Sequence, residues 1–81
     1  MAQKIKADIT LGNNLRRIRR GRKLTQEQVT AKLQLMGFDI TRSIYSQIEC
    51  GTYNIKVTEL LALKEIYDTD FDDIFLGISL H

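Results

Sequence analysis

The stretch LTQEQVTAKLQLMGFDITRSIYSQIECG, residues 24–51, limits what this chain can fold into more than any other part of it. Thr25 and Gln28 have the spacing of a capping box, in which two side chains bind free amide groups at the start of a helix. Thr41 precedes a second helical pattern in the same way, and a glycine follows each pattern as a helix stop. The stretch therefore predicts two helices separated by a turn, over residues 25–36 and 42–50.

A further helix is predicted before this stretch. Leu11, Leu15 and Ile18 recur four and three residues apart, which gives a single apolar stripe along one side of a helix. We expect Thr10 to cap this helix and Gly21 to end it.

Two more helices are predicted after the stretch. Residues 57–67 repeat apolar side chains at helical spacing, and Asp70 is suited to cap a last short helix, because its carboxylate can accept hydrogen bonds from free amides. The chain is thus expected to be all-α, a compact five-helix domain with no strand. The residues that repeat at core spacing in the first of these helices are Leu60, Leu63, Ile66 and Tyr67, and the apolar residues of the last helix are Phe71, Ile74 and Phe75.

The length and composition allow one domain and no obvious catalytic site. Eighty-one residues leave no room for a second core, so residues 1–81 are one domain, with its core over about 9–77 and loose ends at 1–7 and 78–81. The chain has one cysteine and one histidine, which offer no set of metal ligands. It also has no Ser-His-Asp set and no glycine-rich phosphate loop. An enzyme, a metal site and a cofactor are therefore not expected.

The charges are unevenly distributed along the chain. Residues 1–30 hold eight Lys or Arg against two acids, whereas residues 57–81 hold one lysine against six acids. A basic front could face a polyanion such as a nucleic acid. The alternative is that the two ends attract each other or form solvated faces, because charge alone specifies no partner.

No targeting segment is evident. The start, MAQKIKADIT, lacks the apolar stretch of a signal peptide, and the apolar clusters LLAL and IFLGISL are too short to cross a bilayer. A cytoplasmic protein with no membrane partner is therefore expected.

One side of the predicted helix 42–50 carries side chains that can read nucleic-acid bases. Arginine can bind guanine and glutamine can bind adenine through two parallel hydrogen bonds, and serine is short enough to let a helix enter the major groove. Each of these residues could instead be an ordinary solvated residue, and the sequence does not decide whether Ile44 meets a thymine methyl or packs inside. The candidates for base contact are Arg42, Ser43, Ser46 and Gln47.

The chain resembles the lambda-repressor-like, Cro/repressor-type helix-turn-helix family over about residues 9–77. The segments that carry the resemblance are LRRIRR, LTQEQV, ITRSIYSQIECG, TELLAL and FDDIF. The resemblance implies a helix-turn-helix at about residues 25–50, with helix 42–50 in the major groove of double-stranded DNA.

The resemblance also implies roles for individual side chains. Gln26 falls where the family grips phosphate and braces the recognition helix. Arg19 and Glu49 match a structural ion pair that links the first and third helices. The residues that match a loop touching the sugar-phosphate backbone are Thr52, Tyr53 and Asn54.

The chain departs from the family pattern mainly in its turns. The segment QLMGFD lengthens the connection inside the helix-turn-helix by five residues, and we expect Phe38 and Ile40 to pack, since a solvated loop would be polar. Lys23 stands where glycine is usual before LTQ, so Gly21 is expected to adopt the left-handed turn.

These features predict a sequence-specific regulator of transcription that binds double-stranded DNA, of bacterial, phage or mobile-element type. Repression is favoured, because a bound domain of this size blocks polymerase without an effector module. A homodimer on a two-fold operator is expected, and no small-molecule ligand is evident. The alternative is a protein-interaction module, such as an antitoxin-like or adaptor protein. The apolar residues available for a dimer or partner contact are Phe75, Leu76, Ile78 and Leu80.

Overall fold

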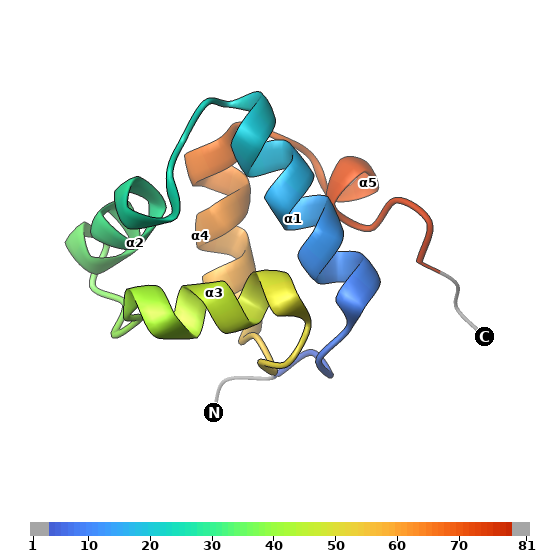
Figure 1. Ribbon diagram of the computed structural model, residues 1–81, viewed down its shortest axis with the longest axis horizontal. Helices are drawn as coiled ribbons and strands as arrows, with labels where there is room; N and C mark the ends of the chain where they lie inside the picture. Colours follow the sequence, from blue (N-terminus) through green and yellow to red (C-terminus); the bar gives the residue numbers. More distant parts are fainter. Residues whose placement is uncertain (1–3, 79–81) are drawn as a thin grey trace.

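The computed structural model describes residues 4–78, and it confirms the predicted all-α fold of five helices. Helices α1 and α4 run through the middle of the molecule, α3 crosses beneath them, α2 lies to one side, and α5 packs against α1 (Figure 1). The helices are α1 (Ile9–Gly21), α2 (Gln26–Leu35), α3 (Arg42–Cys50), α4 (Val57–Tyr67) and α5 (Phe71–Ile74).

The predicted apolar stripes meet in one core. The stripe of α1 is buried, and Leu15 is wholly inaccessible to solvent. All five helices contribute to this core, as does the connection between α2 and α3. The buried apolar residues are Leu11, Leu15, Ile18, Val29, Leu33, Ile40, Tyr45, Ile48, Ile55, Leu60, Ala62, Leu63, Tyr67 and Ile74.

The helix starts follow the predicted caps with one exception. The side chains of Thr25, Thr41 and Asp70 accept backbone amides as expected, and Gln28 completes the capping box. The cap predicted for α1 is wrong: Asp8, not Thr10, accepts the Leu11 amide at 3.0 Å, and the helix begins at Ile9. Asp8 stands three residues before Leu11, which is the spacing at which the side chain of a capping residue reaches a free amide.

The end of α1 also differs from the prediction. Gly21 is helical, and Lys23 itself adopts the left-handed conformation with φ of 58°. Hydrogen bonds from the amides of Lys23 and Leu24 to α1 carbonyls, 3.0 and 3.2 Å long, hold the turn in place. They offset the cost of a left-handed residue other than glycine, which is about 1–2 kcal/mol.

The lengthened connection between α2 and α3 is packed, as predicted. Gly37 ends α2 with φ of 94°, and the Gln34 side chain donates to the Ile40 carbonyl at 3.0 Å. Ile40 is 1% exposed, whereas Phe38 is half-buried and covers the edge of the core. The connection is therefore part of the fold and fixes where α3 begins.

At the C-terminal end, one apolar side chain of α5 enters the core. Ile74 is buried, but Phe71 and Phe75 are exposed and stack on each other with ring centroids 5.9 Å apart. Because α5 has only four residues, it forms about one helical turn, and only one of its sides can face the core. The Asn14 side chain anchors this turn by donating to the carbonyls of Ile74 and Leu76, both at 2.8 Å.

The N-terminal residues 4–7, predicted to be loose, are held against the loop after α3. The Ile5 amide donates to the Ile55 carbonyl at 2.7 Å, and Lys4 and Lys56 form an antiparallel backbone bridge. At the other end, Ile78 packs against the core. The rest of the predicted loose ends, residues 1–3 and 79–81, lies outside the described residues.

Candidate nucleic-acid interface

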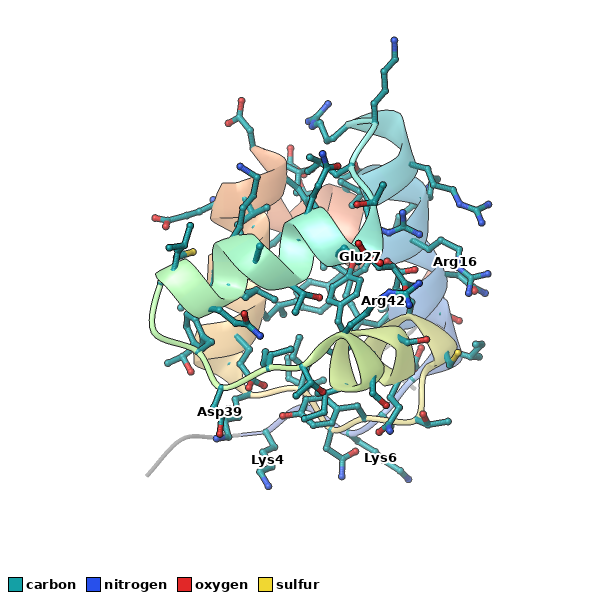
Figure 2. The ribbon with its side chains drawn as sticks, turned by 60° about the vertical axis from the view of Figure 1, so that its left-hand side comes forward. Lys4, Lys6, Arg16, Glu27, Asp39 and Arg42 are labelled. Carbon is teal, nitrogen blue, oxygen red and sulfur yellow. The ribbon has the colours of Figure 1, made fainter. Side chains whose placement is uncertain are left out.

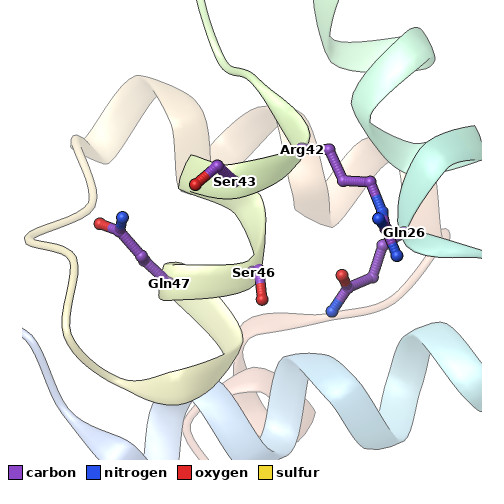
Figure 3. A pocket seen from close by; sticks show the side chains of 5 residues that line it. All are labelled: Gln26, Arg42, Ser43, Ser46 and Gln47. Carbon is purple, nitrogen blue, oxygen red and sulfur yellow. The ribbon is translucent and has the colours of Figure 1, made fainter.

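Helix α3 and the start of α2 bring five of the predicted contact residues together around one shallow, open depression (Figure 3). Three of them are exposed and two are half-buried, so polar groups line a surface that a large ligand can reach. We call this set the reading surface: Gln26, Arg42, Ser43, Ser46 and Gln47.

The opposite side of α3 is anchored in the core. Tyr45, Ile48 and Glu49 are buried, at 0, 3 and 0% exposure. Gly12 of α1 lies so close to the end of α3 that an added Cβ would come within 2.7 Å of the Ile48 carbonyl oxygen. The reading surface is thus carried by a helix whose position is fixed from behind, which suits recognition of a specific geometry.

Glu49 is the centre of the buried polar network behind α3. Its carboxylate accepts from Arg19 Nε at 2.6 Å and Nη2 at 3.1 Å, which is the ion pair implied by the family resemblance. Gln26 Nε2 at 3.1 Å and Arg16 Nε at 3.4 Å also donate to this carboxylate. One buried carboxylate therefore ties α1, α2 and α3 together.

This network keeps Glu49 ionised. Burial alone would raise the pKa of Glu49, but hydrogen bonds from Arg19, Tyr45 and Gln26 favour the charged form and hold that pKa below its ordinary value. The hydrogen bond to Glu49 in turn raises the pKa of the Arg19 guanidinium. The pair is charged at neutral pH, with most of its hydrogen-bonding groups satisfied.

The hydroxyl groups of Tyr45 and Tyr67 form a second buried link, between α3 and α4. Burial is the main cause that raises the pKa of both phenols, so both are neutral. This link fixes the α3 side that faces away from the reading surface.

The Gln26 side chain binds the buried Glu49 network and is also partly accessible to solvent. One amide hydrogen of Gln26 binds Glu49, and the side chain lies at the edge of the reading surface (Figure 3). The second amide hydrogen remains available to an acceptor. This arrangement is compatible with the role implied by the resemblance, in which this residue braces the third helix and grips a phosphate.

Arg42 has an acidic neighbour that the sequence patterns did not single out. Its Nε lies 3.9 Å from a carboxylate oxygen of Glu27, and both side chains are mostly exposed, so the pair is weak (Figure 2). Arg16 was also missed, although it lies three residues before Arg19 on α1 and so on the same side of that helix. Helical spacing could have revealed Arg16, whereas the Glu27 contact depends on how α2 and α3 cross.

The predicted phosphate loop is placed directly after α3, but its polar groups already have partners. Thr52 donates to the Gln47 carbonyl at 3.3 Å, and Asn54 Oδ1 accepts the Ala7 amide at 2.6 Å. The Tyr53 hydroxyl lies 3.3 Å from both carboxylate oxygens of Glu59. A phosphate contact through the Tyr53 hydroxyl would have to replace that bond, whereas the amide nitrogen of Asn54 is still available as a donor.

Within residues 4–78, no three His, Cys, Asp or Glu side chains are arranged to hold a metal ion. None of the helices described is long and apolar enough to cross a membrane.

Comparison with known proteins agrees with this geometry. A helix-turn-helix family model of the Cro/C1 type matches residues 15–74, so the chain belongs to this helix-turn-helix family. No curated protein sequence matches the chain significantly.

Among solved structures, the chain is similar to the restriction-modification controller protein C.AhdI from Aeromonas hydrophila. The two are 28% identical, with a TM-score of 0.68 over 83% of this chain and 94% of that chain. Family and fold together support a DNA-binding regulator.

Proposed function

We propose that this protein is a sequence-specific regulator of transcription that inserts α3 into the major groove of double-stranded DNA and acts as a repressor. The observation that carries the proposal is the reading surface itself. Its polar, accessible side chains converge on one side of a helix whose other side is locked by the Glu49 network. The likeness to a restriction-modification controller protein supports a regulatory role.

In this proposal the contacts divide into two kinds. Arg42, Ser43, Ser46 and Gln47 contact base edges, while Gln26 and the loop 52–54 contact the sugar-phosphate backbone. Base contacts determine which sequence is chosen, and backbone contacts set register and affinity. The protein acts by binding rather than by catalysis, in the compartment that holds the DNA, which we take to be the cytoplasm.

We also propose that the protein binds a two-fold operator as a homodimer. Phe71, Phe75 and Leu76 are 37, 36 and 59% exposed, and they lie together near the end of the described chain. A second copy that covers them would double the number of base contacts. Of the residues expected to form this contact, Ile78 packs against its own core and Leu80 lies outside the described residues.

The experiment begins with selection of bound sequences from a pool of random duplexes. We expect a preferred, two-fold site and a steep fall in affinity with salt. A titration of Arg42→Ala against single-base-pair variants of that site should show a loss of about 1–3 kcal/mol and relaxed choice at one base pair. Tyr53→Phe is the matched variant: it should weaken all duplexes about equally and leave the preferred sequence unchanged.

Three results would contradict the proposal. If Arg42→Ala weakened every duplex by the same factor while Tyr53→Phe changed the preferred base, α3 would not be the reader. A single asymmetric half-site bound by a monomer at every concentration would exclude the homodimer. A stoichiometric protein partner with no affinity for any duplex would favour the antitoxin-like or adaptor alternative.

A further inference from the structure

We propose that residues 4–7, here called the arm, form a second phosphate-binding element that lies outside the helix-turn-helix. In this inference Lys4 and Lys6 contact the backbone of the duplex that α3 reads. The inference rests on the proposed function, and it adds a contact that neither the reading surface nor the loop 52–54 supplies.

The arm is fixed at successive points along the segment that follows α3. Its residues pair in antiparallel order: Lys4 bridges Lys56, the Ile5 amide donates to the Ile55 carbonyl at 2.7 Å, and the Ala7 amide donates to Asn54 Oδ1 at 2.6 Å. This ladder ties the arm to the loop already proposed to contact phosphate.

The residues that follow the arm, at the start of α1, pack closely against the end of α3. A Cβ added to Gly51 would come within 2.5 Å of the Ile9 Cα, so the start of α1 lies directly against the end of α3. The arm and the end of α3 therefore keep one relative position, and the arm does not need to be ordered by a ligand.

The side chains of the arm alternate between inside and outside. Ile5 is half-buried and packs against the core, whereas Lys4 and Lys6 are exposed. Alternation with a period of two is the property of extended backbone, and here it sends both ammonium groups to the same side. Figure 2 shows Lys4 and Lys6 projecting from the edge of the molecule where α3 and its following loop lie.

The charges around the arm leave both lysines available. Among residues 4–78, neither ammonium group lies within 4 Å of a carboxylate. Asp8, the nearest acid in the sequence, caps α1 through the Leu11 amide. Asp39 projects from the same edge of the molecule in Figure 2 without forming an ion pair with either lysine. Two unpaired lysines that flank a polar loop beside a recognition helix fit the regularly spaced charges of a nucleic-acid backbone.

The test measures how affinity for the selected duplex depends on salt. For the double variant Lys4→Gln/Lys6→Gln, the slope of log K against log salt should become shallower by about 1.8 for each bound protomer, and so by about 3.6 for a homodimer, since each lost phosphate contact removes about 0.9. The affinity ratio between parent and variant should then shrink about tenfold per bound protomer, or about a hundredfold for a homodimer, between roughly 50 and 200 mM salt. The preferred sequence should not change, because phosphate contacts carry no base information.

Two further variants serve as controls. Arg20→Gln/Lys23→Gln removes the same charge from the last turn of α1 and the turn after it, which lie at the end of the molecule away from α3 (Figure 1). This variant should keep the parental slope. Lys4→Arg/Lys6→Arg should also keep it, because the positive charges are retained. Thermal unfolding followed by circular dichroism verifies that all three variants fold.

The outcomes separate the arm from the proposed function. A shallower slope in the glutamine arm variant alone supports the inference. An equal change in both glutamine variants would mean a general charge effect and would overturn it, as would no change while the parent still binds a selected site with steep salt dependence. If the parent bound no duplex, the proposed function itself would fail.

Discussion

Glu49→Gln tests whether the buried network behind α3 holds the domain together. The substitution keeps the shape of the side chain but removes the charge that pairs with Arg19, whose own side chain is 10% exposed. Arg19 would then be a buried cation with two neutral partners. One is the amide oxygen that replaces the carboxylate, and the other is the Leu24 carbonyl, which lies 2.8 Å from Nη1.

The expected loss can be estimated from this geometry. Removing one member of a buried ion pair typically costs about 3–5 kcal/mol, and the remaining amide oxygen places this case near 3 kcal/mol. A domain of this length has a total stability of about 4–12 kcal/mol, so the loss is a large share of it. In a urea titration followed by circular dichroism, the unfolding midpoint should fall by about 1.5–3 M.

The pH dependence of the stability is a second test of the role of the Glu49 charge. The pKa of Glu49 in the folded protein lies below its ordinary value of 4.5, so its stabilisation is fully present above pH 4.5 and is lost as the pH falls through the folded pKa. The difference in stability between parent and Glu49→Gln should therefore be full at pH 7 and shrink below pH 4.5.

Two matched variants complete the test. Glu27→Gln removes the carboxylate of the exposed pair with Arg42 and should leave the midpoint nearly unchanged. Replacing both buried partners, with Arg19→Met and Glu49→Leu together, should recover most of the stability lost in the single variant. A loss below about 1 kcal/mol for Glu49→Gln at pH 7, or a loss no greater than that of Glu27→Gln, would refute the reasoning.

Two further predictions concern the turns that set the position of α3. Gly51→Ala should cost about 3 kcal/mol or more, because φ is 75° and the new Cβ would meet the backbone of α1, whereas Gly37→Ala, with φ of 94° in open space, should cost about 1 kcal/mol. Ile40→Ala should cost about 3 kcal/mol and Phe38→Ala about half as much, since only the first is fully buried. Denaturant melts measure both pairs, and a reversed order within either pair would contradict the packing described.

Local sequence patterns determined most of the helical framework. Thr25, Thr41 and Asp70 were identified as caps because an oxygen at that spacing reaches a free amide without help from the rest of the fold. The stripe of α1 was likewise identifiable, since helical periodicity alone decides which side chains share a face. The same periodicity placed the candidate base-contact residues on one side of α3, where the structure brings them together.

Only the tertiary structure decided how the turn after α1 and the N-terminal residues 4–7 are held. Lys23 rather than Gly21 takes the left-handed conformation. The turn before it is tied to the end of α4, because Arg22 donates to the carbonyls of Tyr67 and Asp68. Residues 4–7 are ordered because Ile5 finds a place on the core and their amides find acceptors in the loop after α3. These contacts join residues about fifty positions apart, and no local pattern can encode which distant backbone groups will meet when the helices pack.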